Sequence, residues 1–325
     1  MKRFLRLCLR ALLTVVVLLT VLAVLFAWFV YTPAASLPPL SGSLKRTTID
    51  VNGLQRTYLT YIPQQLPNGA PLVLVLHGSG GGGAQMRAET GYGFDRMADQ
   101  HAFAVVYPYA NEGYWDACNV VGSVSSGALD DVAFLSTVVD RLVGEIGVDP
   151  QRVFAAGSSR GGSMALRLAL EAPQKFRAVA AVSANLAAPE NFKCKPAGNR
   201  TPSVMIMNGT DDPLVPFGGG QVSLFGLLYK NGNVLSSRDS AQYFADLNRI
   251  AARAETRATA MSDDVSVERV LWRDDAKVEV ELVAIHGAGH GIPQPYRRRP
   301  RILGPSPAQP NGVEVIWEFF ARQRP

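Results

Sequence analysis

The stretch VFAAGSSRGGSMALRLAL, residues 153–170, joins an apolar run to a helical pattern through a short turn. The apolar run predicts a buried strand, and the spacing of the apolar residues in MALRLAL predicts a helix. The turn between them contains three glycines and two serines: Gly157, Ser158, Ser159, Gly161 and Gly162. A turn needs only one or two glycines, so this many indicate that the strand and the helix pass close together.

Ser159 stands at the centre of a Gly-x-Ser-x-Gly pattern, with Gly157 two residues before it and Gly161 two residues after it. In a nucleophile elbow this pattern holds the serine at the apex of a strained strand-to-helix turn. Ser158 lacks the two flanking glycines, so we predict Ser159 as the nucleophile. The alternative is that Ser159 only caps the helix, but the strand before it and the helix after it favour the elbow.

Strand-like and helix-like segments alternate along most of the chain. A hairpin is predicted for 44–63, where two alternating runs flank Asn52-Gly53. Continuous apolar runs, typical of strands covered on both faces, occur at 71–78, 102–108, 152–157, 178–184, 203–209 and 277–287. Helical patterns cover 92–100, 130–146, 159–170, 239–255 and 313–323. The alternation predicts an α/β fold with a doubly wound, mostly parallel sheet, and it places the irregular segment 217–238 above the carboxyl edge, where such sheets bind ligands.

A serine nucleophile needs a base, usually histidine, and the chain has four: His77, His101, His286 and His290. His101 lies between a helix and a strand, which indicates a packing or surface role. His77 precedes a glycine-rich loop in which the useful groups are backbone N–H donors. His286 still belongs to the last strand, whereas His290 lies in the following loop between two glycines. We therefore predict His290 as the base, with His286 as the second candidate.

The acid that orients this histidine is expected at a neighbouring strand end. Asp211 and Asp212 directly follow the apolar run 203–209, and they lie between the predicted serine and histidine in the chain. An Asp-Asp-Pro sequence is also good turn chemistry, so a structural role is the alternative. The other acid pair, Asp130-Asp131, precedes a helix and is explained by helix capping.

The glycine-rich loop HGSGGGG, residues 77–83, follows the first apolar run of the predicted sheet. Its backbone can donate to an oxyanion, and we predict the Ser79 N–H in this role, together with the Arg160 N–H beside the nucleophile. A glycine-rich loop can instead bind phosphate, but this one lacks the Gly-Lys-Ser/Thr ending of a P-loop.

Residues 1–31 are predicted to be a targeting segment. Between Ala11 and Tyr31 only Thr14 and Thr20 are clearly polar, and a helix of this length spans about 30 Å, enough to cross a bilayer. Four basic residues precede it, which keeps that end in the cytoplasm and exports the rest: Lys2, Arg3, Arg6 and Arg10. The length favours a retained signal anchor over a cleaved signal peptide. Residues 32–43 are predicted as a linker and 44–325 as the catalytic domain.

The net charge of +5 derives mainly from this targeting segment, since 28 basic and 27 acidic residues remain without its four basic residues. The balance gives no support for nucleic-acid binding. A later basic cluster comprises Arg297, Arg298, Arg299 and Arg301, and we interpret it as a solvated loop rather than a contact with anionic lipid head groups.

Two cysteines lie in the exported part, Cys118 and Cys194, whereas Cys8 precedes the apolar segment. In an exported protein two thiols predict one disulfide. The sequence leaves open whether their Cα atoms come within bonding distance.

Taken together, these segments resemble the polyhydroxybutyrate depolymerase and feruloyl esterase group of α/β hydrolases, over nearly the whole exported part. The matching pieces, in chain order, are LVLHGSGG, FAVVYP, YWDAC, DDVAFLSTVVDRL, VDPQRVFAAGSSRGGSMALRLA, NGTDDPLVPF and GAGHGIP. The resemblance implies Ser159 as nucleophile, Asp212 as acid and His290 as base, with Asp211 as a non-catalytic neighbour.

The sequence also departs from the pattern of this family. Asn208 stands where histidine is common, Arg160 follows the nucleophile where Asn or Ala is usual, and Gly291 begins the segment that replaces an aromatic-Pro ending. No separate substrate-binding domain or threonine-rich linker follows, which makes a soluble or cell-wall ester as plausible a substrate as a crystalline polyester.

The resemblance implies an exported serine esterase that forms an acyl-enzyme and requires no metal or organic cofactor. Its expected partners are an ester substrate and, through the N-terminal segment, a membrane. Trp115 and the segment 217–229 are candidate substrate-wall elements, although core packing is the more usual role of a tryptophan. The alternatives are a non-catalytic membrane-anchored binding module, a serine peptidase and an acyltransferase.

Overall fold

The computed structural model describes the 325-residue chain except residues 120–129, 252–253, 263, 274–277 and 324–325. Its strands are β1 (Ser43–Val51), β2 (Leu54–Ile62), β3 (Leu72–Leu76), β4 (Ala104–Pro108), β5 (Val153–Ser158), β6 (Ala178–Val182), β7 (Ser203–Gly209), β8 (Gly220–Gln221), β9 (Asn233–Val234), β10 (Glu255–Ser262), β11 (Val265–Arg273) and β12 (Glu279–His286). Among the described residues ten of them form one sheet, in the order β1-β2-β4-β3-β5-β6-β7-β12-β11-β10, and β8 and β9 form a separate ribbon.

The middle of the sheet is parallel and both of its edges are antiparallel. Strands β4, β3, β5, β6, β7 and β12 pair in parallel, whereas the hairpin β1–β2 and the hairpin β10–β11 are added in antiparallel orientation. The carboxyl ends of parallel strands meet at one edge of a sheet. The loops that follow β3, β5, β7 and β12 therefore come together there.

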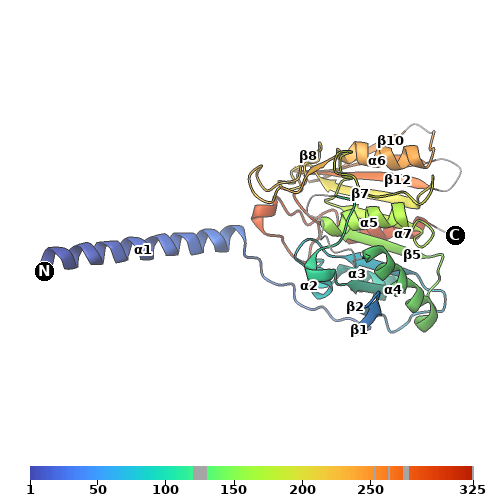
Figure 1. Ribbon diagram of the computed structural model, residues 1–325, viewed down its shortest axis with the longest axis horizontal. Helices are drawn as coiled ribbons and strands as arrows, with labels where there is room; N and C mark the ends of the chain where they lie inside the picture. Colours follow the sequence, from blue (N-terminus) through green and yellow to red (C-terminus); the bar gives the residue numbers. More distant parts are fainter. Residues whose placement is uncertain (120–129, 252–253, 263, 274–277, 324–325) are drawn as a thin grey trace.

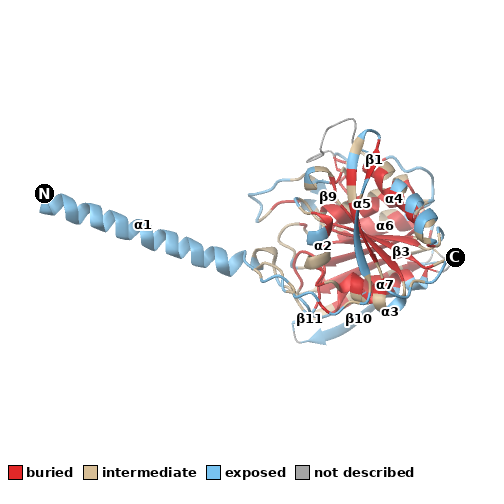
Figure 2. Ribbon diagram, turned by 90° about the horizontal axis from the view of Figure 1, so that it is seen from below, coloured by how far each residue is buried: buried red, intermediate tan, exposed pale blue. Residues whose placement is uncertain are grey.

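Helices cover both faces of the sheet (Figure 1). They are α2 (Gly83–Glu89), α3 (Gly93–His101), α4 (Asp131–Ile146), α5 (Arg160–Glu171), α6 (Ser237–Leu247) and α7 (Gly312–Arg322), with short 3-10 turns η1 (Asn111–Gly113) and η2 (Arg301–Leu303). Leu72 and Leu74 pack in the cluster that contains α4, α5 and α6, whereas Val73 and Val75 pack in the cluster that contains α3 and α7. Figure 2 shows the resulting buried strands between the two helical layers. The predicted doubly wound α/β fold is confirmed.

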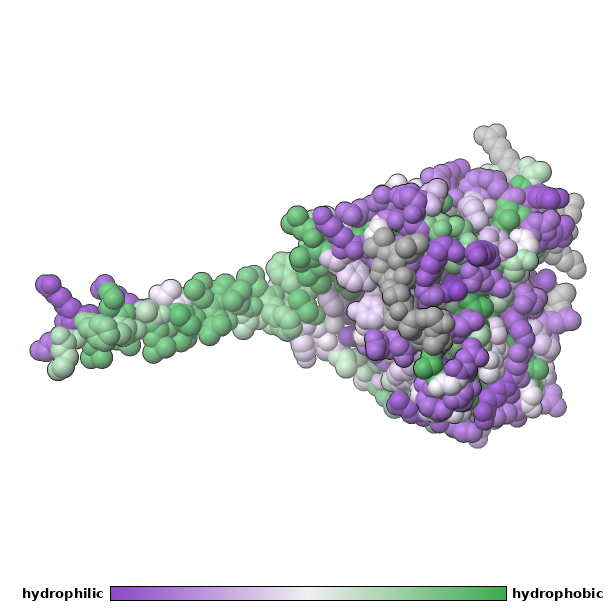
Figure 3. Space-filling view, viewed as in Figure 1, coloured by the Kyte–Doolittle hydropathy of each residue, from purple (hydrophilic) through white to green (hydrophobic). Residues whose placement is uncertain are grey.

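The N-terminal helix α1 (Lys2–Phe29) extends away from the domain (Figures 1 and 2). None of its residues is buried, and it is long and apolar enough to cross a membrane. The helix begins nine residues before the predicted start at Ala11, since the basic residues ahead of the apolar run continue the same helix. The surface of its apolar part is green in Figure 3.

The secondary structure differs from the sequence prediction in several places, and the short helix α2 is one element that was not predicted. The predicted helix 239–255 ends at Leu247, because Arg249 has a positive φ of 57° and turns the chain away. The hairpin β10–β11 was not predicted, because every residue of β10 is exposed and its sequence shows no alternation of apolar and polar residues. Residues 252–253 of the predicted helix and residue 277 of the predicted last strand lie outside the described residues.

Candidate active site

Ser159 lies between the last residue of β5 and the first residue of α5. Its backbone has φ +57° and ψ −123°, a conformation that residues with a side chain rarely adopt. The Ser159 N–H donates to the carbonyl oxygen of Val182 on β6 at 2.8 Å, which holds this strained turn against the neighbouring strand. The turn thus has the geometry of the predicted elbow.

The glycines of the turn are required by the close approach of strand and helix. A Cβ atom at Gly157 would lie 2.1 Å from the carbonyl oxygen of Gly161, and one at Gly161 would lie 2.3 Å from that of Leu76. A Cβ atom at Gly162 would lie 2.7 Å from the Cβ of Ala184. Side-chain atoms cannot occupy these positions without moving the backbone, so the three glycines make room for Ser159 to project from the turn.

Asp212, after β7, and His290, after β12, are brought into direct contact. His290 Nδ1 lies 2.8 Å from Asp212 Oδ2, and the two side chains are only 6% and 1% exposed. The other carboxylate oxygen, Oδ1, accepts the N–H groups of Leu214 and Val215 at 2.8 and 2.9 Å. Because the carboxylate accepts the proton on Nδ1, the Nε2 atom of His290 is left to accept another.

The loop that carries His290 is fixed on two sides. The His290 N–H donates to the carbonyl oxygen of Leu303 at 2.7 Å, and the Gly291 N–H donates to Ser183 Oγ at 2.6 Å. Since both bonds hold the backbone next to the ring, the imidazole is positioned before any substrate binds.

The other candidates for the base and the acid lie elsewhere. His286 remains at the end of β12, with its Nε2 3.5 Å from a carboxylate oxygen of Glu268. Asp211 is exposed and accepts the hydroxyl of Thr210 at 2.9 Å. His101 is the last residue of α3, and its ring packs against the ring of Trp317. Of the predicted pairs, only Asp212 and His290 are in contact.

Ser159 and His290 line the same pocket, which has a volume of about 360 Å³. Gly78 and Ser79, in the loop after β3, form the wall beside the serine, and a Cβ atom at Gly78 would lie 3.5 Å from that of Ser159. Within the described part of the chain no group of three or more His, Cys, Asp or Glu side chains is placed to hold a metal ion.

His77 holds the loop that contains Ser79. Its Nδ1–H donates to the carbonyl oxygen of Gly78 at 2.7 Å, and its Nε2 accepts the N–H of Ala110 at 3.0 Å. Burial lowers the pKa of His77, so the ring stays neutral, as this donor and acceptor pair requires. The sequence analysis assigned no role to this ring, which here fixes the backbone of the predicted oxyanion loop.

The two predicted oxyanion donors come from different elements, the loop after β3 and the start of α5. Ser79 borders the pocket, and its backbone N–H forms no hydrogen bond with the residues that the structure describes. The backbone N–H of Arg160 belongs to the first turn of α5, where the helix dipole is positive. Both positions suit donors to a developing negative charge.

Comparison with known proteins places this chain in a family. Residues 53–290 match a family model described as "Putative esterase". The chain is also 31% identical to the "Putative esterase NocK" of Nocardia uniformis subsp. tsuyamanensis over 307 residues, which cover 89% of this chain and 86% of that protein. The chain belongs to this esterase family. Its reaction class is accordingly the hydrolysis of carboxylic esters.

Two further similarities agree with this assignment. The esterase is 31% identical to "Feruloyl esterase B" of Neurospora crassa over 128 residues, which cover 38% of this chain and 42% of that protein. The structure of an acetyl xylan esterase from Aspergillus awamori matches with a TM-score of 0.60 at 17% identity, over 86% of this chain and 100% of that one. The structural match supports the α/β-hydrolase fold.

Trp115 of the esterase is fully buried and lies outside the residues that line the pocket. Its Nε1–H donates to the carbonyl oxygen of His77 at 2.9 Å, and the centres of the two rings are 5.0 Å apart. The prediction that Trp115 forms a substrate wall is therefore not supported by its position. Its side chain instead supports the loop of Ser79 from behind, because its ring fills the core beneath His77.

The side chain of Arg160, the residue after the nucleophile, has a structural partner. The Nε–H donates to the carbonyl oxygen of Trp115 at 2.6 Å, and the residue is 5% exposed. Burial lowers the pKa of this guanidinium. The residue after the nucleophile therefore contacts the segment that supports the oxyanion loop.

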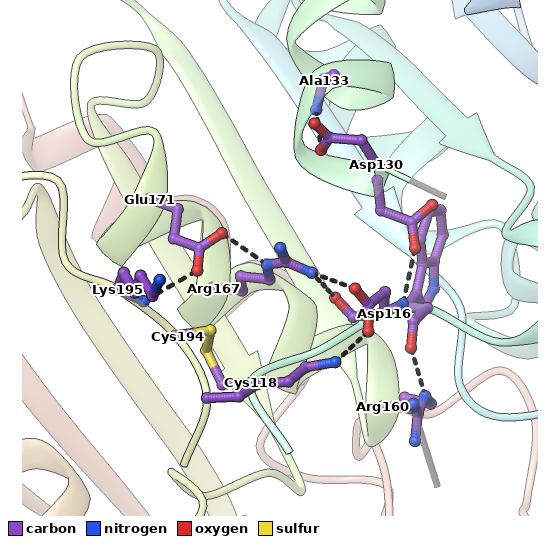
Figure 4. A network of polar contacts seen from close by, with 12 residues as sticks. Asp116, Cys118, Asp130, Ala133, Arg160, Arg167, Glu171, Cys194 and Lys195 are labelled. Atoms are coloured by element: carbon purple, nitrogen blue, oxygen red, sulfur yellow. Dashed lines mark hydrogen bonds and ion pairs between the residues drawn. A yellow bond between two sulfur atoms is a disulfide. The ribbon is translucent and has the colours of Figure 1, made fainter. Parts of the chain in front are cut away.

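The segment around Asp116 is tied to α5 by an ion pair, and to residues 193–194 by a second ion pair and a disulfide (Figure 4). Asp116 Oδ2 lies 2.8 Å from Arg167 Nη1, and Asp116 Oδ1 pairs with Lys193. Cys118 and Cys194 form the predicted disulfide, with their Cα atoms 4.9 Å apart. These contacts fix the segment that carries Trp115 and thereby the back of the site.

All of the side-chain groups of Asn208 are paired. Its amide donates to Asn185 Oδ1 at 2.7 Å and to Ser237 Oγ at 2.8 Å, and its Oδ1 accepts the N–H of Ala184 at 3.1 Å. A neutral amide is thus accommodated at this buried position without a charge.

Arg299 lines the pocket, which corrects its interpretation as part of a solvated loop. Its guanidinium lies against Gly291, the residue after His290. A Cβ atom at position 291 would lie 2.0 Å from Cζ of Arg299, so the glycine leaves room for the guanidinium. Its Nε and Nη2 are buried and have no partner among the described residues, and burial lowers the pKa of Arg299. No sequence pattern indicates this contact, because it depends on how the loop folds back over Gly291.

Proposed function

We propose that the esterase cleaves its substrate through Ser159, His290 and Asp212. The observation that supports this most strongly is the pocket shared by Ser159 and His290, with His290 bonded to the buried Asp212. In the first step Ser159 Oγ attacks the carbonyl carbon of the ester while His290 Nε2 takes its proton. Asp212 holds the ring and stabilises the imidazolium that forms.

The tetrahedral intermediate carries a negative oxygen, which the N–H groups of Ser79 and Arg160 stabilise. His290 then gives its proton to the leaving alcohol, and an acyl-enzyme remains on Ser159. A water molecule, deprotonated by His290, attacks the acyl carbonyl and releases the acid. This second half restores the free serine and the neutral histidine.

We place the substrate among feruloyl, acetyl or polyhydroxyalkanoate esters. Relatives named for feruloyl and acetylxylan ester hydrolysis support the first two classes. The third rests on the resemblance of the motifs in the sequence. The pocket, of about 360 Å³, is large enough for a single aromatic or short aliphatic acyl group.

We further propose that α1 is retained as a signal anchor, with the catalytic domain outside the cytoplasm. The basic residues that precede the apolar part of α1 favour this orientation. The disulfide between Cys118 and Cys194 is consistent with an oxidising compartment. Cell fractionation with external protease tests the orientation: digestion of the domain in intact spheroplasts is expected, and protection would contradict it.

The reaction is tested by comparing three classes of substrate. Ethyl ferulate, acetylated xylan and hydroxybutyrate oligomers are incubated with the wild-type protein and with Ser159→Ala, beside a peptide substrate and an added alcohol acceptor. We expect ester hydrolysis that is lost in the variant, with little peptide cleavage or acyl transfer. Hydrolysis that survives in Ser159→Ala would contradict the proposed mechanism.

A further inference from the structure

A group of exposed apolar side chains lies in the loop between β8 and β9. Phe225, Leu227, Leu228 and Tyr229 are 61%, 79%, 64% and 45% exposed, and we call these four residues the apolar tip. Over the rest of the described catalytic domain, exposed large apolar residues are separated along the chain. Clustered exposed apolar residues in a soluble domain indicate a contact surface.

The apolar tip is held in place and forms part of the pocket rim. Leu224 and Leu228 exchange two backbone hydrogen bonds, of 2.7 and 3.1 Å. The hydroxyl of Tyr229 donates to Ser79 Oγ at 2.7 Å, and both Leu224 and Tyr229 line the pocket. Because the backbone is fixed in this way, the leucine side chains are directed outward rather than folded into the domain.

The end of α1 meets the same rim from another side. The guanidinium of Arg301 lies 3.8 Å from the centre of the Trp28 ring, and its Nη1 donates to the Trp28 carbonyl oxygen at 3.1 Å. Two residues further on, Leu303 lines the pocket and accepts the N–H of His290. One short segment, η2, therefore connects the last turn of α1 to the active site.

The figures place these elements on one side of the domain. In Figures 1 and 2 the loop between β8 and β9 extends toward α1, and η2 lies on the same side. Figure 3 shows apolar surface on this side of the domain, near the end of the apolar helix. A membrane crossed by α1 would face this side.

We propose that the apolar tip docks on the outer surface of the membrane that α1 spans, so that the pocket opens at the lipid surface and receives esters held in that membrane. The inference rests on the proposed anchor and on the proposed esterase site. It adds the surface that contacts the lipid and the phase from which the substrate enters.

The residues of this face suit a lipid surface. Leucine and phenylalanine enter the boundary of the acyl chains, whereas tyrosine favours the level of the head groups. Lys230 follows the apolar tip directly, and Arg298 and Arg301 are exposed beside η2, where they can meet lipid phosphates. A purely aqueous substrate would not require apolar side chains directed away from the pocket.

The proposal is tested with spin labels on the full-length protein in vesicles of phosphatidylcholine and phosphatidylglycerol. The Cys8→Ser background leaves only the disulfide cysteines, so a single label is attached at Leu228→Cys. A matched label at Thr256→Cys lies on β10, an exposed edge strand of the sheet. Collision rates with oxygen, which concentrates in lipid, and with a nickel chelate, which stays in water, are then measured.

We expect the label at position 228 to collide mainly with oxygen and the label at position 256 mainly with the nickel chelate. Equal access of the chelate to both labels would overturn the docking. Dipolar broadening between labels at position 228 would also overturn it, because a second copy would then cover the apolar tip. Reaction of Ser159 with a fluorophosphonate checks each labelled protein for an intact site, so failure of the esterase mechanism is recognised separately.

A kinetic comparison is the second test. It separates loss of membrane docking from a change in the shape of the pocket, because a changed pocket would affect soluble and vesicle-bound substrates alike. The double variant Leu227→Ser and Leu228→Ser is compared with wild type on the acetate ester of a long-chain alcohol, dissolved in vesicles, and on soluble p-nitrophenyl acetate, so that both substrates carry the same acyl group. We expect the rate on the vesicle-bound ester to fall about tenfold or more, because two leucine side chains leave the lipid, with the soluble ester nearly unaffected. An equal loss on both substrates, or no loss on the vesicle-bound ester, would contradict the proposal.

Discussion

The exchange Asp212→Asn tests how the carboxylate orients His290. In the wild type, Oδ1 accepts two backbone N–H groups at 2.8 and 2.9 Å, and Oδ2 lies 2.8 Å from His290 Nδ1. An asparagine has one acceptor, which the two backbone donors will retain, so its amide N–H₂ must face His290. Nδ1 then becomes an acceptor, the ring proton moves to Nε2, and Nε2 can no longer take the proton of Ser159.

The magnitude follows from this loss of the base. In serine proteases the same exchange lowers kcat about 10⁴-fold, which corresponds to about 5 kcal/mol of transition-state stabilisation. We expect a similar loss in kcat on p-nitrophenyl acetate, with a nearly unchanged unfolding midpoint because the shape of the side chain is kept. A variant that retains more than about a tenth of the wild-type kcat would refute the tautomer argument.

Asp211→Asn is the matched control. Asp211 is the adjacent residue, it carries the same charge, and its side chain is exposed and accepts, among the residues that the structure describes, only the hydroxyl of Thr210. We expect activity close to wild type, since the loss of one charge near the site is screened by water. A loss as large as that in Asp212→Asn would mean that the charge of the loop, rather than the contact with His290, controls the rate.

Three further predictions concern stability. Gly157→Ala should lower the free energy of unfolding by about 3 kcal/mol or more in urea titrations, because the new Cβ would lie 2.1 Å from a backbone oxygen; an unchanged midpoint would disprove the close approach. Reduction of Cys118–Cys194, which are 76 residues apart, should cost about 4 kcal/mol and lower Tm, whereas equal thermal unfolding with and without reductant would contradict this. Burial raises the pKa of Asp95 to about 6, above its unfolded value of 3.8, so its contribution to stability is complete below pH 3.8 and is lost as the pH rises through 6. Between pH 4 and 7 the free energy of unfolding of the wild type should therefore fall by up to about 3 kcal/mol relative to that of Asp95→Asn. If the free energies of unfolding of the two proteins changed in parallel with pH, this prediction would be wrong.

The parts of the site that depend on local sequence could be predicted. The elbow at Ser159 follows from glycine spacing between a strand and a helix, and the structure shows the corresponding backbone conformation. The contact of His290 with Asp212 could be anticipated because both residues follow parallel strands, whose carboxyl ends meet at one edge. The resemblance already implied Asp212 rather than Asp211, and the loop position favoured His290 over His286, but only the fold shows which acid contacts which histidine.

Contacts between segments that are far apart in the sequence could not be predicted in this way. Tyr229 and Ser79 are 150 residues apart, and no pattern in either segment indicates their hydrogen bond. Trp115 was a candidate for the substrate wall, with core packing as the more usual role of a tryptophan, and the structure buries it with its Nε1–H bonded to the carbonyl oxygen of His77. The strand β10 was not predicted, because its exposed residues lack the alternation of apolar and polar side chains that indicates a half-buried strand.

Whether Ser159 is an activated nucleophile is tested by labelling the full-length protein with a fluorophosphonate probe, followed by mass spectrometry of the labelled peptide. We expect rapid labelling on Ser159, none on Ser158, and loss of labelling in a folded Ser159→Ala variant. An unlabelled but folded wild-type protein, or a label that persists in Ser159→Ala, would contradict the assignment of Ser159 as an activated nucleophile. The first of these results would instead favour a non-catalytic binding module with the same fold.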